Sequence, residues 1–466
     1  MGFMNIHDVL IMDNKENIYS FYMYEKKIKM VLYDKNSEKA EKRILISDCL
    51  DEYDSTISED GTVYLVCQKI DGSIVLVSID GYKQEEHLLA EKFDAKLRNI
   101  NIKVINDQIH IIYCVEANEG NNKFRIYHHS LLKDEWDTHI VTDITKREIL
   151  NPISIIQLED MVVMGYYDIV DNIEQVFVNT FSLADSQWSD KIQLTTDSSA
   201  KMYLDMLSQG NNEIDLCYSK LIDGNFVITY EKYNILNGEI TRVTEHVLSN
   251  PANCMYPTFI NSGGTLWTIW IEYDGLLSCF SEDRGLSWSS PYSWENSKKD
   301  DFARYKFSTN NSSIIDGYNF NYGFGTYGKS TSFIGFGDIQ NAVEVPLKSQ
   351  IKKKVDEEKI DELDILSERD VSRIEDNLID IKENKEMKEI EELKVKLEGI
   401  EELKERVTII EQALKTITEI LENKISETSS QNQNIDTCEE KIIGIEKRVN
   451  DIEYFLSRRR RGFLMR

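Results

Sequence analysis

Residues 281–288 of this chain read Ser281-Glu282-Asp283-Arg284-Gly285-Leu286-Ser287-Trp288. An apolar run, residues 276–280, precedes them. An aspartate can hydrogen-bond to backbone groups of its own turn, and a glycine two residues later supplies a positive φ. The serine and tryptophan that follow suit the start of a strand, where the indole can be buried. The stretch therefore predicts a β-hairpin turn.

The spacing of these residues, S-x-D-x-G-x-[ST]-W, resembles the Asp-box, or BNR repeat, of sialidase-like β-propellers. All five specified positions match, and they are Ser281, Asp283, Gly285, Ser287 and Trp288. The resemblance implies a turn in a propeller blade in which the aspartate is structural. It does not imply catalysis.

A polar turn between two apolar strands recurs along the chain in steps of about 46 to 53 residues. The seven occurrences are Asp13-Asn14, Asp60-Gly61, Asn106-Asp107, Glu159-Asp160, Asn211-Asn212, Gly263-Gly264 and Asn310-Asn311. Four strand-like runs separate successive turns, which favours propeller blades over a sandwich. We favour an all-β propeller of seven blades, with six as the alternative. Residues 304–346 alternate glycine with aromatic residues and would form the closing blade.

Large apolar residues give a second landmark with a related spacing. Trp136 and Trp188 stand 52 residues apart, Trp288 lies 100 residues further on, and Ile240 is close to midway between the last two. Each follows a polar turn. We interpret these residues as equivalents of the 281–288 hairpin in other blades, although tryptophans also pack cores without any repeat.

The composition changes abruptly near residue 347, where aromatic residues give way to Glu, Lys, Ile and Leu. Apolar residues then recur in steps of three and four, as in a coiled-coil seam. The seam is Leu393, Leu397, Ile400, Leu403, Val407, Ile410, Leu414, Ile417 and Leu421. We predict a propeller at 1–346, a linker and start of a helix at 347–389, and a coiled-coil stalk at 390–457. The stalk predicts self-association as a dimer or a trimer, with packing onto the propeller as the alternative.

The stalk region contains a polar stretch, residues 424–434, after which the apolar pattern resumes in the same phase. A single long helix is therefore favoured over a hinge that folds the last helix back. A basic tail at 458–466 begins with four arginines, Arg458 to Arg461. This tail would contact an anionic surface or an acidic protein, or would simply complement the dipole of the preceding helix.

Composition narrows the classes of function. The 466 residues carry a net charge of −28, which argues against a nucleic-acid-binding surface. The 7 cysteines are scattered without metal-ligand spacing, so we expect reduced, buried thiols and no metal or other cofactor. Neither a signal peptide nor a transmembrane segment is apparent. We expect a cytoplasmic origin, with later assembly into a surface or spore layer as an option.

The resemblance to sialidases raises the question of catalysis. Sialidases bind a carboxylate substrate with three arginines, and the nearest match to the first arginine motif is Phe124-Arg125-Ile126-Tyr127. It lacks the proline of that motif and falls in the third repeat. His128 and His129 are adjacent in a predicted strand, so they point to opposite faces and cannot share a metal; we expect surface histidines there. No catalytic residue is assigned.

These observations predict a non-enzymatic binding or structural protein with a propeller head and an oligomerising stalk. A glycan or a protein would bind to the propeller face, as suits components of cell surfaces, spore coats or phage fibres. The alternative is a diverged glycoside hydrolase of the sialidase class.

Overall fold

The computed structural model describes residues 3–37, 40–117, 122–132, 135–147, 150–236, 238–327 and 332–348. The chain divides into two units, Met1–Glu357 and Glu358–Arg466. The predicted coiled-coil seam, the stalk at 390–457 and the basic tail lie outside the described residues. None of the described helices is long and apolar enough to cross a membrane.

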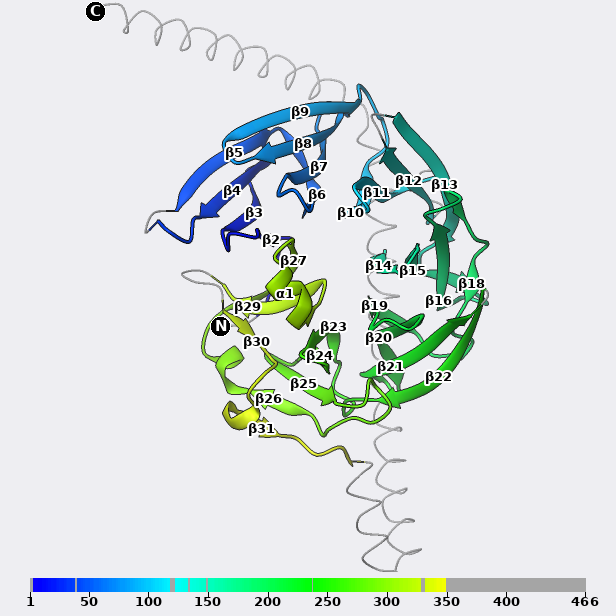
Figure 1. Ribbon diagram of the computed structural model, residues 1–466. Coiled ribbons are helices and arrows are strands. Elements are labelled where there is room, and N and C mark those ends of the chain that lie inside the picture. Colours follow the sequence, from blue (N-terminus) through cyan, green and yellow to red (C-terminus); the bar gives the residue numbers. More distant parts are fainter. Residues whose placement is uncertain are drawn as a thin grey trace, which may run out of the picture. The chain divides into compact units, whose positions relative to one another are not determined.

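Strands of the first unit form six sheets within the described ranges. Figure 1 shows these sheets arranged in a ring, with the first strand of each sheet facing the centre. Each sheet contains one antiparallel meander of four strands in chain order, which we number blades 1 to 6. This arrangement is that of a β-propeller.

The strands of the first three blades have the following bounds. Blade 1 comprises β2 (Val9–Met12), β3 (Ile18–Tyr24), β4 (Lys27–Tyr33) and β5 (Glu41–Ser47). Blade 2 comprises β6 (Cys49–Ile57), β7 (Val63–Lys69), β8 (Ile74–Asp80) and β9 (Lys83–Ala90). Blade 3 comprises β10 (Leu97–Ile105), β11 (Gln108–Glu116), β12 (Lys123–Leu132) and β13 (Glu135–Thr145).

The other three blades follow the same order. Blade 4 comprises β14 (Ser154–Leu158), β15 (Met161–Val170), β16 (Ile173–Ser182) and a split fourth strand, β17 (Gln187–Trp188) and β18 (Ile192–Gln193). Blade 5 comprises β19 (Lys201–Leu207), β20 (Glu213–Ile222), β21 (Asn225–Leu236) and β22 (Glu239–Val247). Blade 6 comprises β23 (Met255–Ser262), β24 (Thr265–Glu272), β25 (Gly275–Ser281) and β26 (Tyr292–Trp294), extended at its two edges by β28 (Tyr318–Asn319) and β31 (Ala342–Glu344).

Six of the seven predicted turns connect the first and second strands of the six blades, as the sequence repeat requires. The backbone at Asn106-Asp107 and at Asn211-Asn212 has a positive φ at both residues. Two consecutive residues of this kind make the tight hairpin turn whose twist matches the strands, and Asn tolerates that conformation. The repeat in the sequence therefore reports a real structural period.

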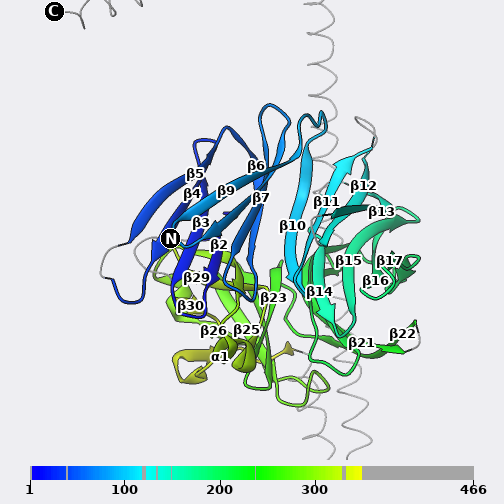
Figure 2. The same ribbon diagram turned by 45° about the horizontal axis from the view of Figure 1, so that its top comes forward.

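The seventh predicted unit does not form a separate sheet. Its strands β27 (Phe302–Thr309), β29 (Tyr322–Thr326) and β30 (Phe333–Ile334) belong to the sheet of blade 1, because β27 pairs in parallel with β2. The short β1 (Phe3–Met4) also pairs with β27, on the edge opposite to β29, and β2 and β29 lie in the same part of the ring in both views (Figures 1 and 2). The favoured prediction of seven separate blades is corrected to six sheets, one of which closes the ring.

The turn predicted at Asn310-Asn311 is not a hairpin. Asn311 caps α1 (Ser312–Gly317), accepting hydrogen bonds from the backbone of Ser313 and Ile314. We call residues 310–321 the closing segment. The side chain of Asn310 donates to the carbonyl of Ser58 in blade 2 (3.0 Å), and that of Asn319 donates to Ser208 after β19 (2.9 Å). The segment therefore crosses one end of the ring instead of reversing into a strand. Two 3-10 turns, at Glu295–Lys298 and Ile339–Asn341, complete the described elements.

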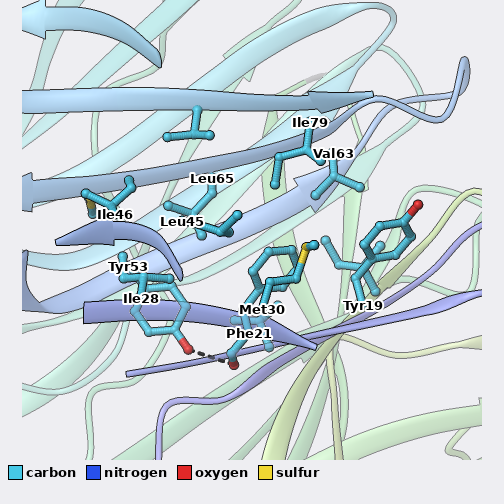
Figure 3. Close-up of a cluster of buried hydrophobic side chains, with 14 of the residues drawn as sticks. Tyr19, Phe21, Ile28, Met30, Leu45, Ile46, Tyr53, Val63, Leu65 and Ile79 are labelled. Carbon is cyan, nitrogen blue, oxygen red and sulfur yellow. Dashed lines mark hydrogen bonds between the residues drawn. The ribbon is translucent and has the colours of Figure 1, made fainter. Parts of the chain in front are cut away.

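Apolar side chains fill the spaces between neighbouring blades. Figure 3 shows one such cluster between blades 1 and 2, where Phe21, Met30 and Leu65 are fully buried. Tyr53 of β6 reaches across and donates to the carbonyl of Phe21 (2.8 Å). The six described cysteines are buried and free, as the sequence predicts for small apolar residues in a core.

The hairpin at 281–288 joins β25 to β26 and is held by its own side chains. Asp283 Oδ1 accepts from Ser281 Oγ and from the backbone of Ser287, both at 2.8 Å, and Asp283 Oδ2 accepts from Ser287 Oγ (2.6 Å). These bonds lower the pKa of Asp283 to about 2. Gly285 has φ of +90°, and a Cβ there would lie 1.8 Å from Tyr230 Oη of blade 5. The glycine is required by both conformation and space.

The equivalent hairpin of blade 4 repeats part of this pattern. Ser289 Oγ accepts from the backbone of Phe280, and Ser189 Oγ accepts from that of Thr180, both at 3.0 Å. The tryptophans before these serines, Trp288 and Trp188, each pack on the third strand of the preceding blade. Trp136 and Ile240 lie at the start of the fourth strands of blades 3 and 5. The predicted landmark thus marks one position in four blades.

Replacing Asp283 with alanine should lower the free energy of unfolding by about 1–2 kcal/mol, because two serine hydroxyls and a backbone amide lose their acceptor. Chemical denaturation measures the change. Glu282→Ala, an exposed neighbour in the same turn, serves as the control and should leave stability unchanged. Equal stability of wild type and Asp283→Ala would contradict a structural role for the aspartate.

Candidate functional site

The first strands of blades 3, 5 and 6 share a β-bulge near their N-terminal ends. The ladder skips one extra residue between Arg98 and Asn101 in blade 3, between Met202 and Asp205 in blade 5, and between Met255 and Thr258 in blade 6. The first bulged residues are Asn99, Tyr203 and Tyr256, with φ of 51°, 56° and 52°. A left-handed tyrosine is strained by about 1–2 kcal/mol, and such strain is typical of functional sites.

These bulges meet at one end of the central channel, which we call the mouth. The side chain of Asn99 donates to the carbonyl of Asn151 in the segment before β14 (2.9 Å). Asn151 Oδ1 accepts from the backbone of Tyr203 (3.3 Å). The rings of Tyr203 and Tyr256 are 4.3 Å apart, tilted by 37°. Asn99, Asn151, Tyr203 and Tyr256, the mouth arc, therefore form a continuous chain of contacts across blades 3 to 6.

The mouth contains a pocket of about 280 Å³. The mouth arc lines one side, and Phe3, the N-terminal residues 5–9, Glu52, Arg304, Lys306 and Tyr322 are among the residues that line the rest. Arg304 has its guanidinium 3.8 Å from the centre of the Tyr322 ring and donates through Nε to Thr258 Oγ1 (2.8 Å). Stacking and hydrogen bonding together fix this arginine beside the tyrosines.

Carboxylates of the mouth are held in place by cations. Glu52 accepts from the backbone of Asn99 and forms an ion pair with Arg98 (3.3 Å). Below it, Asp54 is buried and pairs with Lys306 Nζ (2.5 Å) while accepting from the backbone of Ile102 (2.7 Å). Asp8 lines the same pocket, and burial raises its pKa to about 7. The pocket therefore offers fixed acceptors, one fixed guanidinium and two tyrosine faces.

None of the five residues of the 281–288 hairpin lines the mouth. Arg125 forms an exposed ion pair with Asp143 on blade 3 (2.7 Å), and Arg242 pairs with Glu231 on blade 5 (3.1 Å). Among the arginines that the structure describes, Arg304 alone lines the pocket. The described part of the chain thus does not gather three arginines around this site.

His128 and His129 do point to opposite faces, because His128 stacks on His110 whereas His129 stacks on Tyr113. The expectation of surface histidines is wrong for His128, which is 1% exposed. The side chain is covered because blade 4 packs Phe181 and Trp188 against it. The alternation of side chains along a strand correctly predicted that the two histidines point to opposite faces of the sheet. It did not predict burial, because neighbouring blades cover both faces of most sheets in a propeller.

The mouth arc was not predicted from the sequence, although the spacing of its residues could have indicated it. Its signal is present, because Asn99, Asn151 and Tyr203 follow one another at intervals of 52 residues and Tyr256 lies one further repeat on. When the repeats are aligned on their turns, these four residues fall at two neighbouring positions: Asn99 and Tyr256 lie 7 residues before the turn, and Asn151 and Tyr203 lie 8 before it. Each of these blades thus has a polar or aromatic residue where a strand core would have an apolar one.

Comparison with protein-family models finds no match, and neither does comparison with curated proteins. Solved structures do match. A six-bladed fucose-recognising lectin of Aleuria aurantia is 10% identical, with a TM-score of 0.37, over 61% of this chain and 94% of the lectin. The α-L-arabinofuranosidase Arb93A of Fusarium graminearum is 10% identical, with a TM-score of 0.36, over 60% and 93%. The WD40 domain of SCAP from fission yeast is 10% identical, with a TM-score of 0.37, over 62% and 76%. Similarities this low do not tell us what this chain binds.

Proposed function

We propose that this protein is a non-enzymatic carbohydrate-binding propeller and that the mouth is its binding site. The observation that carries the proposal is the pair of strained tyrosines, Tyr203 and Tyr256, held side by side at equivalent bulges. Both tyrosines are partly exposed and line the pocket. Aromatic faces are apolar surfaces on which the C–H groups of a sugar ring can lie.

The polar groups around the tyrosines suit the hydroxyl groups of a sugar. Each hydroxyl both donates and accepts, and the mouth provides Glu52 as an acceptor, Arg304 as a donor, and the amides Asn99 and Asn151 as both. A volume of about 280 Å³ is at the small end of ligand pockets. It fits the terminal unit of a glycan better than a long chain. Glu52 and Asp54 are engaged in ion pairs, so they serve as fixed acceptors.

Exchanging Tyr203 and Tyr256 for asparagine separates binding from stability. Asparagine tolerates a positive φ, so we expect unfolding stability to be kept or raised by about 1 kcal/mol in each variant. Loss of the stacking face should weaken glycan binding at least tenfold. A glycan array identifies the ligand of the wild type, and calorimetric titration then compares the variants.

Tyr273→Asn is the matched control, because Tyr273 also has a positive φ (54°) but is 78% exposed at the turn after β24. Its substitution should relieve strain in the same way and leave glycan binding unchanged. Full glycan binding by both mouth variants would exclude the mouth as the site, and an array with no bound glycan would remove the proposed function.

We also infer that the 281–288 turn is an Asp-box with a structural role, supported by the bonds of Asp283 to Ser281 and Ser287. Its place between blades 5 and 6 supports the same role, since Arg284 pairs with Glu213 of blade 5 (3.0 Å). The turn would then attach one blade to the next.

We further propose that the coiled coil predicted at 390–457 joins two or three propellers, which would raise avidity for a repeated glycan. Full-length protein should be a dimer or trimer by light scattering. Val407→Asp with Leu414→Asp should give a monomer, because charges would be buried in the seam without partners. Thr408→Asp with Gln412→Asp, off the seam, should stay oligomeric. A monomeric wild type would rule out the stalk.

A further inference from the structure

The central channel has a second chamber at the end opposite to the mouth. Residues at the C-terminal ends of first strands line it, among them Thr56, Ile105 and Leu207, together with Ser308 near the C-terminal end of β27. The closing segment contributes Ile314, Tyr318 and Asn321, and Figure 1 shows α1 near the centre of the ring. The chamber has a volume of about 440 Å³, large enough for a small organic molecule.

A polar layer separates this far chamber from the mouth. In it, Lys306 Nζ contacts Asp54 (2.5 Å) and Asn101 Oδ1 (3.1 Å), and Lys306 lines the mouth side only. Lys103 of β10 lines the far chamber only. Lys103 Nζ donates to Asn321 Oδ1 (2.9 Å), and that asparagine is fixed by its own bond to the carbonyl of Met206 (3.2 Å).

The charges of this layer do not balance. Lys103, Lys306 and Arg304 are three cations, whereas Asp54 and Asp205 are the two carboxylates that act on them. Asp54 forms an ion pair with Lys306, and Asp205 accepts a hydrogen bond from the backbone N–H of Phe259 (2.9 Å). Lys103 Nζ donates to an amide oxygen, that of Asn321, rather than to a carboxylate. Burial and the neighbouring Lys306 lower the pKa of Lys103 to about 8, so it remains mostly charged at neutral pH.

We propose that the far chamber binds a small organic monoanion, a carboxylate or sulfonate with an apolar body. The anionic head contacts Lys103 Nζ and neutralises the excess positive charge of the layer. The apolar body lies against Ile105, Leu207 and Phe307, and the hydroxyls of Thr56 and Ser308 lie on the same wall. An opposite charge contributes more beside a cation that is partly withdrawn from water, and Lys103 is only partly exposed.

The probe for this site is 8-anilinonaphthalene-1-sulfonate (ANS), which carries one sulfonate on an apolar body. A fluorescence titration of the full chain should show one saturable site, which octanoate displaces and 1-octanol does not. Lys103→Gln should weaken ANS binding at least tenfold, whereas Lys103→Arg keeps the charge and should bind within threefold of wild type. Lys42→Gln, on the exposed outer strand β5, is the matched control and should have no effect.

Several results would overturn the proposal. Unchanged ANS binding by Lys103→Gln would place the probe elsewhere, and equal displacement by octanol would show that the charge plays no part. Loss of binding by Lys103→Arg as well as Lys103→Gln would show that the positive charge is not what the ligand requires. Thermal unfolding of each variant shows that the propeller is intact, so a loss of ANS binding in a folded Lys103→Gln alone supports the site.

Discussion

Replacing Lys232 with methionine should lower the free energy of unfolding by about 3–5 kcal/mol. Lys232 is 2% exposed, and its Nζ donates to the carbonyl of Arg284 (2.7 Å) and pairs with Glu213 (2.9 Å). It also lies 3.9 Å from Asp215, which is fully buried. Methionine fills the space of the lysine stem but leaves the buried Asp215 without the lysine charge, whereas Glu213 keeps its ion pair with Arg284 (3.0 Å). The hydrogen bond to the carbonyl of Arg284, one of the links from the 281–288 hairpin to blade 5, is lost as well.

The pH dependence of this variant is a second measurement. Burial already raises the pKa of Asp215 above its ordinary value, and Lys232 opposes that shift. Without the lysine, Asp215 prefers its protonated form more strongly, so the deficit relative to wild type should be largest at pH 7 and should shrink as the pH falls toward 4.

Lys83→Met removes an exposed ion pair, Lys83–Glu85 (2.8 Å), and provides the control. Exposed pairs contribute little, so the midpoint of unfolding should stay within error. If both lysine variants unfolded at the wild-type midpoint, Lys232 and its buried carboxylate partners in blade 5 would not stabilise the fold.

Acidification from pH 6.5 to pH 4 should destabilise the propeller by on the order of 3 kcal/mol for each of two buried histidines. Burial lowers the pKa of His110 to about 4, and burial together with the neighbouring histidines lowers that of His128 to about 2. Both are uncharged in the fold at pH 5, whereas in the unfolded chain they bind protons below about pH 6.5. Stability is therefore full above pH 6.5 and falls as the unfolded state takes up protons.

The geometry explains why these histidines resist protonation. Trp188 Nε1 donates to His128 Nδ1 (3.1 Å), so His128 carries its proton on Nε2 and donates to His110 Nδ1 (3.0 Å). A further proton on either ring would face a donor. Phe181 and His139 cover the rest of the pair, and His139 itself contacts Asp137 (3.0 Å).

His110→Asn keeps an acceptor near the position of Nδ1 and removes one titrating group. The variant should be less stable than wild type at pH 7, and the gap should narrow by about 2 kcal/mol at pH 5. Urea denaturation at the two pH values measures the difference, with the exposed His87→Asn as control. A gap that does not change with pH would mean that His110 titrates in the fold as it does in the unfolded chain.

The blade repeat could be predicted from the sequence because it depends on interactions between neighbouring residues. A hairpin at Asn106-Asp107 requires residues that tolerate a positive φ, and Trp188 and Trp288 each follow a polar turn. Both signals involve only a few neighbouring residues, so they can be recognised separately in each repeat. The propeller, the six first turns and the place of the tryptophans follow from them.

The site and the closure of the ring depend on pairings between distant residues, which no local pattern carries. A bulge at Tyr203 appears only when β19 is set beside β20, and a tyrosine in a strand is otherwise ordinary. Asn310-Asn311 has the composition of a hairpin turn, yet Asn311 caps a helix, because Asn suits both roles. Whether Asn310-Asn311 forms a hairpin turn or a helix cap is decided by distant contacts, because blade 2 and blade 5 bind the two ends of the closing segment.

The parallel pairing of β2 with β27 has a consequence for how the protein is made. Thr309 bonds to the carbonyl of Met12 across 297 positions of the chain, and a ribosome adding roughly 5–20 residues per second needs about 15–60 s to synthesise that length. During this time Val9, Leu10 and Ile11 form an apolar strand edge with no partner on that side. Such an edge pairs readily with other chains. The N-terminal blade of the newborn protein therefore stays open to such pairing until residue 309 has emerged and the inner edge of that blade is covered.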